Sequence, residues 1–180
     1  MFLSNQTIEK YIDEGKITIN PDFDKKNIRP VGVRIHLGKT ILIPAPNQTI
    51  DLTGQQDLKY REVDLEIEEF YLEPNGFILG VTYEAIQTSK DIITFLDGRS
   101  TVARVGLTTH ITSFVIDGTF EAPHTIVLEM KNVGNFRIRL KWKDPIAMIF
   151  FAQLKEKVTH DLQSRYIAGQ NTVTPPNLTW

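Results

Sequence analysis

The sequence predicts a mainly β protein, either an antiparallel sandwich or a distorted antiparallel barrel, with one short helix at the N-terminus and one short helix in the middle of the chain. Apolar and polar residues alternate along most of the chain after Gly15, which is typical of antiparallel strands with one face in water. Turn sequences such as EPNG, TSKD and KWKDP separate these runs. Short strands at this density favour a sandwich or barrel over a fold that alternates strands with helices.

Composition limits the classes of function. The chain has 180 residues, which suits one domain with a sizeable core. Its formal net charge is −2, so we expect no nucleic-acid or membrane partner, since both kinds of surface need a basic excess. No apolar run reaches the length of a membrane span, and we see no secretion signal. Cysteine is absent, which excludes disulfides and thiolate metal sites and fits a cytoplasmic protein.

The first predicted element is a short amphipathic helix in SNQTIEKYIDEG. Ser4 or Asn5 can cap its start, and Gly15 can end it. Its apolar stripe consists of Ile8, Tyr11 and Ile12.

The strands that follow are predicted from their period of two. In VRIHL, VDLEIEEFYL and FRIRLKW, every second residue is apolar. The residues predicted to share an apolar face in these runs are Val33, Ile35 and Leu37, then Val63, Leu65 and Ile67, then Phe136, Ile138, Leu140 and Trp142. Further strands are expected in FILGVTYE, DIITFL, TTHITSFVI, HTIVLEM and PIAMIFFAQL. Residues 1–160 then form the domain, and residues 161–180 form a non-helical tail.

The central helix is expected in LDGRSTVARVGL, residues 96–107. Ser100 can cap it and Gly106 can end it. Two arginines and two hydroxyls at a capped helix start are typical of an anion site. A buried helix whose few polar side chains are hydrogen-bonded within the protein is equally compatible with this sequence, because short motifs match by chance.

The segments around this helix resemble the dCTP deaminase branch of the dUTPase-like superfamily. GRSTVARVGL is followed by THITSFVID and then by HTIVLEMKN, an order similar to the GRSSxARxGL, HVTA, ID and ITLE–Asn elements of that family. FLSNQTIEKYI, NIRPVGVRIHLG, LEPNGFILGVTYEAI and SRYIAGQN resemble further family segments. The resemblance implies a homotrimer of dUTPase-like distorted β-barrels with active sites between subunits. It also implies a deoxynucleoside triphosphate substrate with Mg²⁺ on its phosphates, and deamination of dCTP to dUTP and ammonia.

That deamination is expected to need no zinc. Zinc deaminases require a His or Cys ligand set with a PCxxC element, and this chain has no cysteine. Hydrolytic deamination then needs a carboxylate with a raised pKa that activates water and moves protons. Glu129 lies in an otherwise apolar strand, and the resemblance gives it this role, with Arg104 orienting the water. A surface glutamate and a helix-surface arginine fit the same two positions on residue type alone.

The resemblance assigns the remaining site residues. Ser100 is expected to serve both phosphate binding and the active site. The other expected contacts are Arg99 and Thr101 to the phosphates, His110, Thr112 and Ser113 to the base, Asp117 and Phe120 to the sugar, and Arg165 and Gln170 from a tail that covers the nucleotide.

Several positions depart from the family pattern. Gly32, Arg34 and His36 stand where the family has Ser, Asp and Arg, and Gly118-Thr119 replaces a Pro-Gly pair. Two alternative functions remain open. One is a dUTPase, or a bifunctional enzyme that releases dUMP and pyrophosphate. The other is a non-catalytic nucleotide-binding paralogue with a regulatory role.

Overall fold

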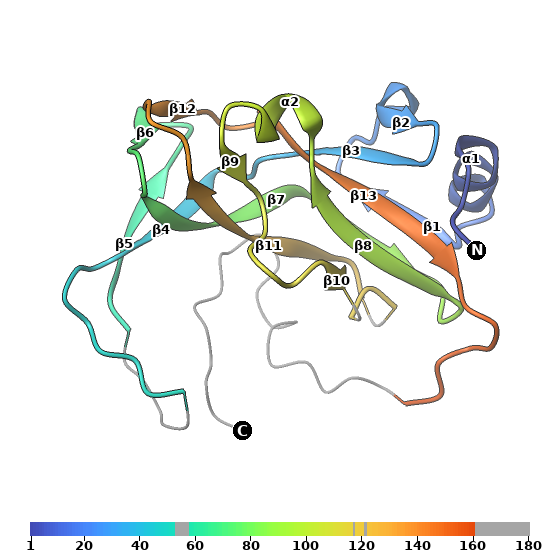
Figure 1. Cartoon of the computed structure of the whole chain (residues 1–180). Helices are drawn as coiled ribbons and strands as arrows, with labels where there is room; N and C mark the ends of the chain where they lie inside the picture. Colours follow the sequence, from blue (N-terminus) through green and yellow to red (C-terminus); the bar gives the residue numbers. More distant parts are fainter. Residues whose placement is uncertain (53–57, 117, 121, 161–180) are drawn as a thin grey trace.

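Two antiparallel sheets dominate the structure, a computed structural model that describes residues 1–52, 58–116, 118–120 and 122–160 (Figure 1). The first sheet has the strand order β5-β4-β7-β11-β9, and β1 pairs with the last residues of β7. The second has the order β10-β8-β13-β3-β2, and β12 pairs with β6. The predicted mainly β class is therefore confirmed. Within the described ranges the two sheets remain open and do not close into a complete barrel.

The elements have the following bounds. The helices are α1 (Asn5–Asp13), the single 3₁₀ turn η1 (Lys25–Asn27) and α2 (Ser100–Ala103). The first sheet contains β1 (Ile17–Asn20), β4 (Thr40–Pro44), β5 (Tyr60–Asp64), β7 (Phe77–Thr88), β9 (Leu107–Thr108) and β11 (His124–Asn132). The second contains β2 (Ile28–Arg29), β3 (Gly32–His36), β8 (Ile92–Gly98), β10 (Val115–Ile116) and β13 (Pro145–Gln153). The remaining pair is β6 (Phe70–Leu72) and β12 (Ile138–Leu140).

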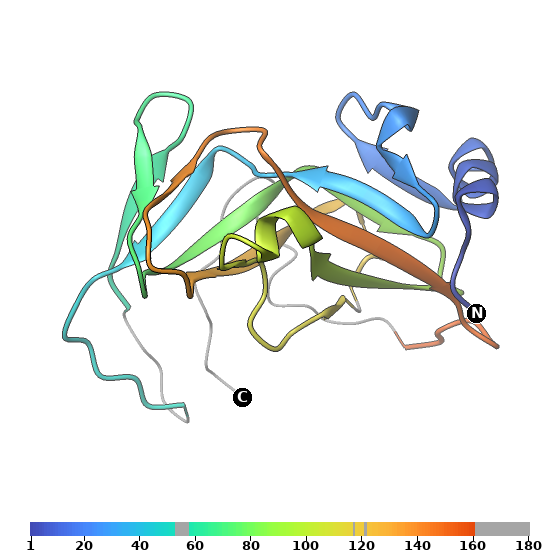
Figure 2. The same cartoon turned by 45° about the horizontal axis from the view of Figure 1, so that its top comes forward.

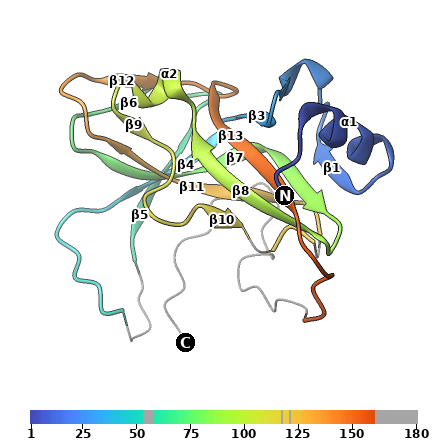
Figure 3. The same ribbon diagram turned by 45° about the vertical axis from the view of Figure 1, so that its right-hand side comes forward.

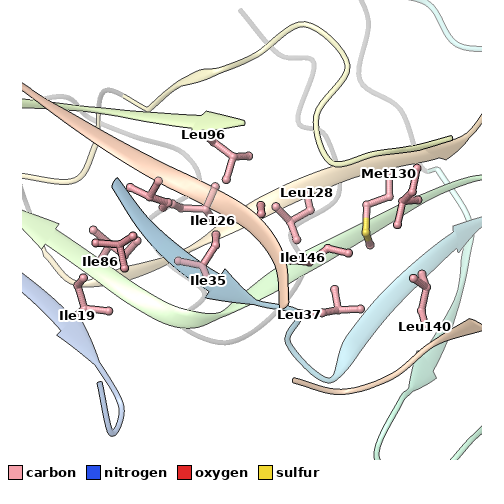
Figure 4. Close-up of a cluster of buried hydrophobic side chains, with 14 of the residues drawn as sticks. Ile19, Ile35, Leu37, Ile86, Leu96, Ile126, Leu128, Met130, Leu140 and Ile146 are labelled. Atoms are coloured by element: carbon pink, nitrogen blue, oxygen red, sulfur yellow. The ribbon is translucent and has the colours of Figure 1, made fainter. Parts of the chain in front are cut away.

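The core lies between the two sheets. Ile35 of β3 and Leu37, the residue after β3, meet Leu128 and Met130 of β11, as Figure 4 shows, and all four side chains are fully buried. The alternation predicted for VRIHL is thus confirmed. Burial of each such side chain contributes about 1.5–3 kcal/mol, so this layer fixes which face of β3 and of β11 points away from the core.

The N-terminal helix forms where it was predicted. Ser4 occupies the N-cap position of α1, although its side chain makes no capping hydrogen bond. Ile8 is fully buried, and Tyr11 and Ile12 pack against the core. Gly15 follows the helix with a φ of 70°, a value that favours glycine. The helix lies beside β1 (Figure 3). No helix in the described part of the chain is long and apolar enough to cross a membrane.

The predicted strand in VDLEIEEFYL is broken. Ile67, which was expected to face the core, is 86% exposed. The reason is Asp64, whose carbonyl oxygen accepts the N–H groups of Ile67 and Glu68 at 3.1 and 2.8 Å. The chain turns there and resumes as β6. The predicted strand in FRIRLKW is also shorter than expected, since β12 covers Ile138–Leu140 and Phe136 is half exposed.

The predicted strand in TTHITSFVI is likewise divided. Its beginning belongs to β9 in the first sheet, and its end forms β10 in the second. Between them Ile111 and Phe114 are about half exposed, at 52% and 51%, so the apolar side chains of this segment do not follow a single core face. The segment passes from one sheet to the other and brings His110 close to β11.

Candidate active site

Glu129 lies in the middle of β11, on the face that points away from the main core. Its neighbours Leu128 and Met130 are fully buried on the opposite face. Glu129 pairs with Leu79 of β7, which belongs to a second apolar cluster, formed by Leu42, Leu79 and Val81 with Tyr60 and Val127 packed against it. The carboxylate therefore stands at the edge of an apolar surface and is itself half-buried.

This environment changes the acidity of Glu129. Burial raises the pKa of its carboxyl above the ordinary value of 4.5. The backbone N–H of Ile111 and the charge of His110 act in the opposite direction and do not cancel the effect of burial. A carboxyl group with a raised pKa is better suited both to accept and to return a proton than an ordinary carboxylate is.

His110 lies next to Glu129 because of the pairing of β9 with β11. Thr108 is opposite Lys131, so the chain two residues further on reaches the level of Glu129. Nε2 of His110 lies 3.1 Å from Oδ1 of Asp97. Its Nδ1 is buried and has no hydrogen-bond partner in the described part of the chain. A buried ring nitrogen without a partner costs free energy, so a further hydrogen-bond partner at Nδ1 would be stabilising.

The segment from Arg99 to Gly106 carries the other predicted catalytic residues. It follows β8 and lies next to the start of β13 (Figure 2), where an Arg99 Nη1 donates a hydrogen bond to the carbonyl oxygen of Pro145. Ser100, Thr101 and Arg104 are exposed. Gly106 ends the turn as predicted, with a φ of 77°.

The expected N-cap residue is not as predicted. Arg99, and not Ser100, occupies the N-cap position, and it makes no side-chain capping hydrogen bond. The helix α2 has four residues, too few aligned peptide groups to create a substantial dipole. Any anion bound here has to be held by the side chains.

Arg104 is not among the groups that act on the carboxyl of Glu129 within the described part of one copy of the chain. In the described residues, the side chains and amides that shift the pKa of Glu129 come from His110 and Ile111. The two residues also lie on different parts of the fold, Arg104 after α2 and Glu129 in β11 (Figure 1).

The predicted base and sugar contacts lie on the segments between β9 and β11. Thr112 and Ser113 are exposed in the loop that follows His110, and Phe120 is half-buried. Asp117, Arg165 and Gln170 lie outside the described residues, and so does the predicted tail of residues 161–180.

Two residues of this region were missed from the sequence. One is Asp97, which fixes His110 and has no pattern around it that points to the site. The other is Thr119, which is fully buried, and its Oγ1 shares hydrogen bonds with Oγ1 of Thr88 at 2.8 Å and of Thr94 at 3.0 Å. Thr119 thereby anchors the segment that carries Phe120 to both sheets. Its only signal in the sequence was its departure from the family's Pro-Gly.

The departure at His36 has a local explanation. Its backbone N–H donates to Oε2 of Glu84 at 2.8 Å, and its Nδ1 lies 2.5 Å from Oε1 of the same carboxylate. Glu84 is 4% exposed, so this pair is satisfied internally. It lines a separate cavity of about 220 Å³ together with Tyr83 and Lys143.

The described residues do not form a protein-ligated metal site. In the described ranges, no group of three or more histidine, aspartate or glutamate side chains is placed to hold a metal ion. The charged groups that act on Arg99 are the two arginines Arg29 and Arg34, which are not Mg²⁺ ligands. The Mg²⁺ that the resemblance implies thus finds no ligand set among these side chains.

The fold matches that of a solved deaminase. The crystal structure of 2′-deoxycytidine 5′-triphosphate deaminase from Agrobacterium tumefaciens superposes with a TM-score of 0.63 at 17% identity, over 83% of this chain and 47% of that one. This chain thus spans about half the length of that structure. The two chains therefore share one fold, and it is mainly β as expected from the sequence.

Sequence comparison identifies the family. The family model described as dCTP deaminase-like matches residues 2–154. The chain belongs to this family, and it is an enzyme. It is 35% identical over 156 residues to a protein of Methanosphaera stadtmanae named "dCTP deaminase, dUMP-forming", which covers 83% of this chain and 77% of the relative. It is 34% identical over 176 residues to a Psychromonas ingrahamii protein named "dCTP deaminase", over 92% and 90% of the two chains.

Proposed function

We propose that this enzyme deaminates dCTP by hydrolysis, without zinc, and releases ammonia. The observation that carries the proposal is Glu129, a half-buried carboxyl with a raised pKa that lies beside His110 and next to the apolar residues Leu79 and Val127. The names of its relatives support dCTP as the substrate.

The proposed reaction uses Glu129 to move protons. Glu129 removes a proton from a water molecule as the water oxygen forms a bond to C4 of cytosine, and it passes this proton to the ring nitrogen N3. The same carboxylate then transfers the second proton of the attacking water to the exocyclic amine. The C4–N bond then breaks, ammonia departs, and C4 becomes the carbonyl of uracil. A carboxyl whose pKa lies nearer to neutrality is efficient in both directions of transfer.

Arg104 is proposed to act on this reaction from another copy of the chain. Its guanidinium is exposed, and it does not act on Glu129 of the same chain. A homotrimer with sites between subunits, as the resemblance implies, supplies Arg104 from a neighbour, where it orients the water and stabilises developing charge. Size measurement in solution, together with loss of activity in Arg104→Met, tests this arrangement.

The nucleotide is proposed to bind along the elements around Glu129. The proposed contacts are Arg99, Ser100 and Thr101 to the phosphates, His110, Thr112 and Ser113 to the base, Asp117 and Phe120 to the sugar, and Arg165 and Gln170 over the triphosphate. Mg²⁺ is expected to arrive on the phosphates of the nucleotide, where it supplies charge neutralisation. The cytoplasmic location expected from the sequence stays a prediction.

The test is a product assay with a matched pair of variants. Purified protein is incubated with dCTP, and ammonia and deoxyuridine nucleotide are measured. Glu129→Gln is expected to reduce turnover at least 1,000-fold while dCTP still binds. Glu66→Gln, a change of the same chemistry at an exposed position, is expected to leave turnover unchanged. Full activity in Glu129→Gln would contradict the assignment of the proton shuttle.

A second candidate is the bifunctional reaction, in which the enzyme also releases pyrophosphate and forms dUMP. The specific observation in its favour is that relatives with the two kinds of name are equally similar to this chain, at 35% and 34% identity. In this case Asp117 activates a second water at the α-phosphate. Pyrophosphate measured alongside ammonia separates the candidates, since only the bifunctional enzyme releases both from dCTP.

A further inference from the structure

Three arginines meet on the outer face of the second sheet. β3 and β8 both pair with β13, and Met148 of β13 lies between Arg34 on one side and Asp97 on the other. Val33 and Ile35 are fully buried, so Arg34 between them is on the opposite, outer face. Arg99 follows β8 and donates to the carbonyl oxygen of Pro145 at the start of β13.

The third arginine comes from the adjacent edge strand. Arg29 of β2 is paired with Gly32 of β3, two residues before Arg34. Burial lowers the pKa of the Arg99 guanidinium, and the charges of Arg34 and Arg29 lower it further. Three like charges from β2, β3 and the end of β8 thus gather in one place.

These charges have no counter-charge in the described part of the chain. No ion pair to Arg29, Arg34 or Arg99 occurs among its salt bridges. Asp97 lies in the same row, but its carboxylate contacts Nε2 of His110 and the N–H of Gly98. Nε of Arg34 is buried without a hydrogen-bond partner. Since unpaired buried donors and clustered like charges are both costly, the cluster is suited to an anionic ligand.

We infer that Arg34 is a further binding residue for the phosphate chain of the substrate, and that Arg29, Arg34 and Arg99 together bind this chain without requiring a divalent cation. The inference rests on the proposed function, which supplies a triphosphate at Arg99. An arginine fork donates two parallel hydrogen bonds to phosphate oxygens, and Arg34 has its buried Nε free to do so.

The direct test uses inorganic tripolyphosphate as the probe, with binding measured by calorimetry in the presence of EDTA. The wild-type protein is expected to bind it, and Arg34→Met is expected to weaken binding at least tenfold. Arg61→Met removes an arginine of β5 that pairs with Glu68, and it is expected to change binding less than twofold. Equal binding by Arg34→Met and wild type, or loss of wild-type binding in EDTA, would overturn the inference.

Thermal unfolding distinguishes a binding role from a structural one. Without ligand, Arg34→Met is expected to melt at the same temperature as the wild type or higher, because it relieves repulsion. With tripolyphosphate, its melting temperature is expected to rise less than that of the wild type. A ligand-free variant that melts lower, with the same rise on adding the probe, would show that Arg34 is structural and would overturn the inference.

Turnover of dCTP separates the inference from the proposed function. If wild-type protein binds tripolyphosphate through Arg34 but releases no ammonia from dCTP, the inference stands and the proposed deamination fails. If dCTP is deaminated and Arg34→Met leaves the KM unchanged, the deamination stands and the inference fails.

Discussion

The Nε2 atom of His110 lies 3.1 Å from Oδ1 of Asp97, and this contact joins the end of β8 to the loop beside Glu129. Asp97 is 70% exposed at its side chain, whereas His110 is 20% exposed. A carboxylate that holds one ring nitrogen fixes the orientation of the ring and determines which nitrogen faces the site. Asp97 is therefore a positioning residue for His110.

Asp97→Asn is expected to lower kcat for dCTP about tenfold, because the amide no longer fixes the charge and tautomer of His110. The free energy of unfolding should change by less than about 1 kcal/mol, since exposed pairs contribute little to stability. Steady-state kinetics and urea denaturation measure the two effects. Asp13→Asn, which alters an exposed carboxylate on α1 that pairs with Lys25, is the control. A large loss of stability in Asp97→Asn would instead indicate a structural role.

The raised pKa of Glu129 predicts how activity depends on pH. The ionised carboxylate accepts the proton from water, so kcat/KM is expected to fall as the pH drops through a pKa that lies above the ordinary value of 4.5. A pH–rate profile for dCTP measures this pKa. An acid limb at or below pH 4.5 would contradict the assignment of Glu129 as the base.

The same shift has a consequence for stability. Because burial raises the pKa of Glu129 in the folded state, the folded protein binds this proton more tightly than the unfolded chain does. The stabilisation is complete below the unfolded pKa and is lost as the pH rises through the folded pKa. Glu129→Gln is therefore expected to raise the melting temperature relative to wild type at pH 8, and the difference should vanish below pH 4.5. Melting curves across this range check the sign.

The sequence predicted those parts of the fold in which one face of a strand meets the core. Val33, Ile35 and Leu37 alternate, and all three are buried. Ile67 alternates equally well and is exposed, because Asp64 accepts two backbone N–H groups and turns the chain. Such a turn depends on a local hydrogen bond that competes with the strand, and hydrophobic periodicity does not reveal it.

The candidate site could be predicted only in part for a similar reason. Glu129 stood out as a carboxylate in an apolar strand, and the family motif pointed to it. Its contact with His110 depends on the pairing of β9 with β11, and the contact of His110 with Asp97 depends on how β8 ends. These are relations between strands that are distant in sequence, so they follow from the topology and not from any motif. The arginine cluster arises in the same way from three strands.

Substitution of Thr119 is expected to affect both the stability of the fold and substrate binding. Thr119→Val removes the hydroxyl that Thr88 and Thr94 share, and it leaves those buried groups with fewer partners. The expected loss in unfolding free energy is about 1–3 kcal/mol. The KM for dCTP should also rise, because Phe120 is adjacent. Thr159→Val, at an exposed position, should alter neither quantity in denaturation and kinetic measurements.

The end of α2 provides a last prediction, on how the backbone holds Arg104. Gly106 and Gly15 both have positive φ values, 77° and 70°, so alanine at either position is strained by about 1–2 kcal/mol. A Cβ at Gly106 would also lie 2.6 Å from the backbone nitrogen of Gly134, whereas a Cβ at Gly15 meets nothing within 4 Å.

Gly106→Ala is therefore expected to lose more unfolding free energy than Gly15→Ala, since only the former adds a clash to the strain. Urea denaturation measures the unfolding free energy of both variants. The difference between them reports the clash alone, because the backbone strain of a positive φ is common to both. Gly106→Ala is also expected to lower turnover, since relief of the clash moves the segment that carries Arg104, while Gly15→Ala should keep full turnover. Equal losses of stability in the two variants would mean that the chain around Gly134 adjusts freely, and that the position of Arg104 is not set by this contact.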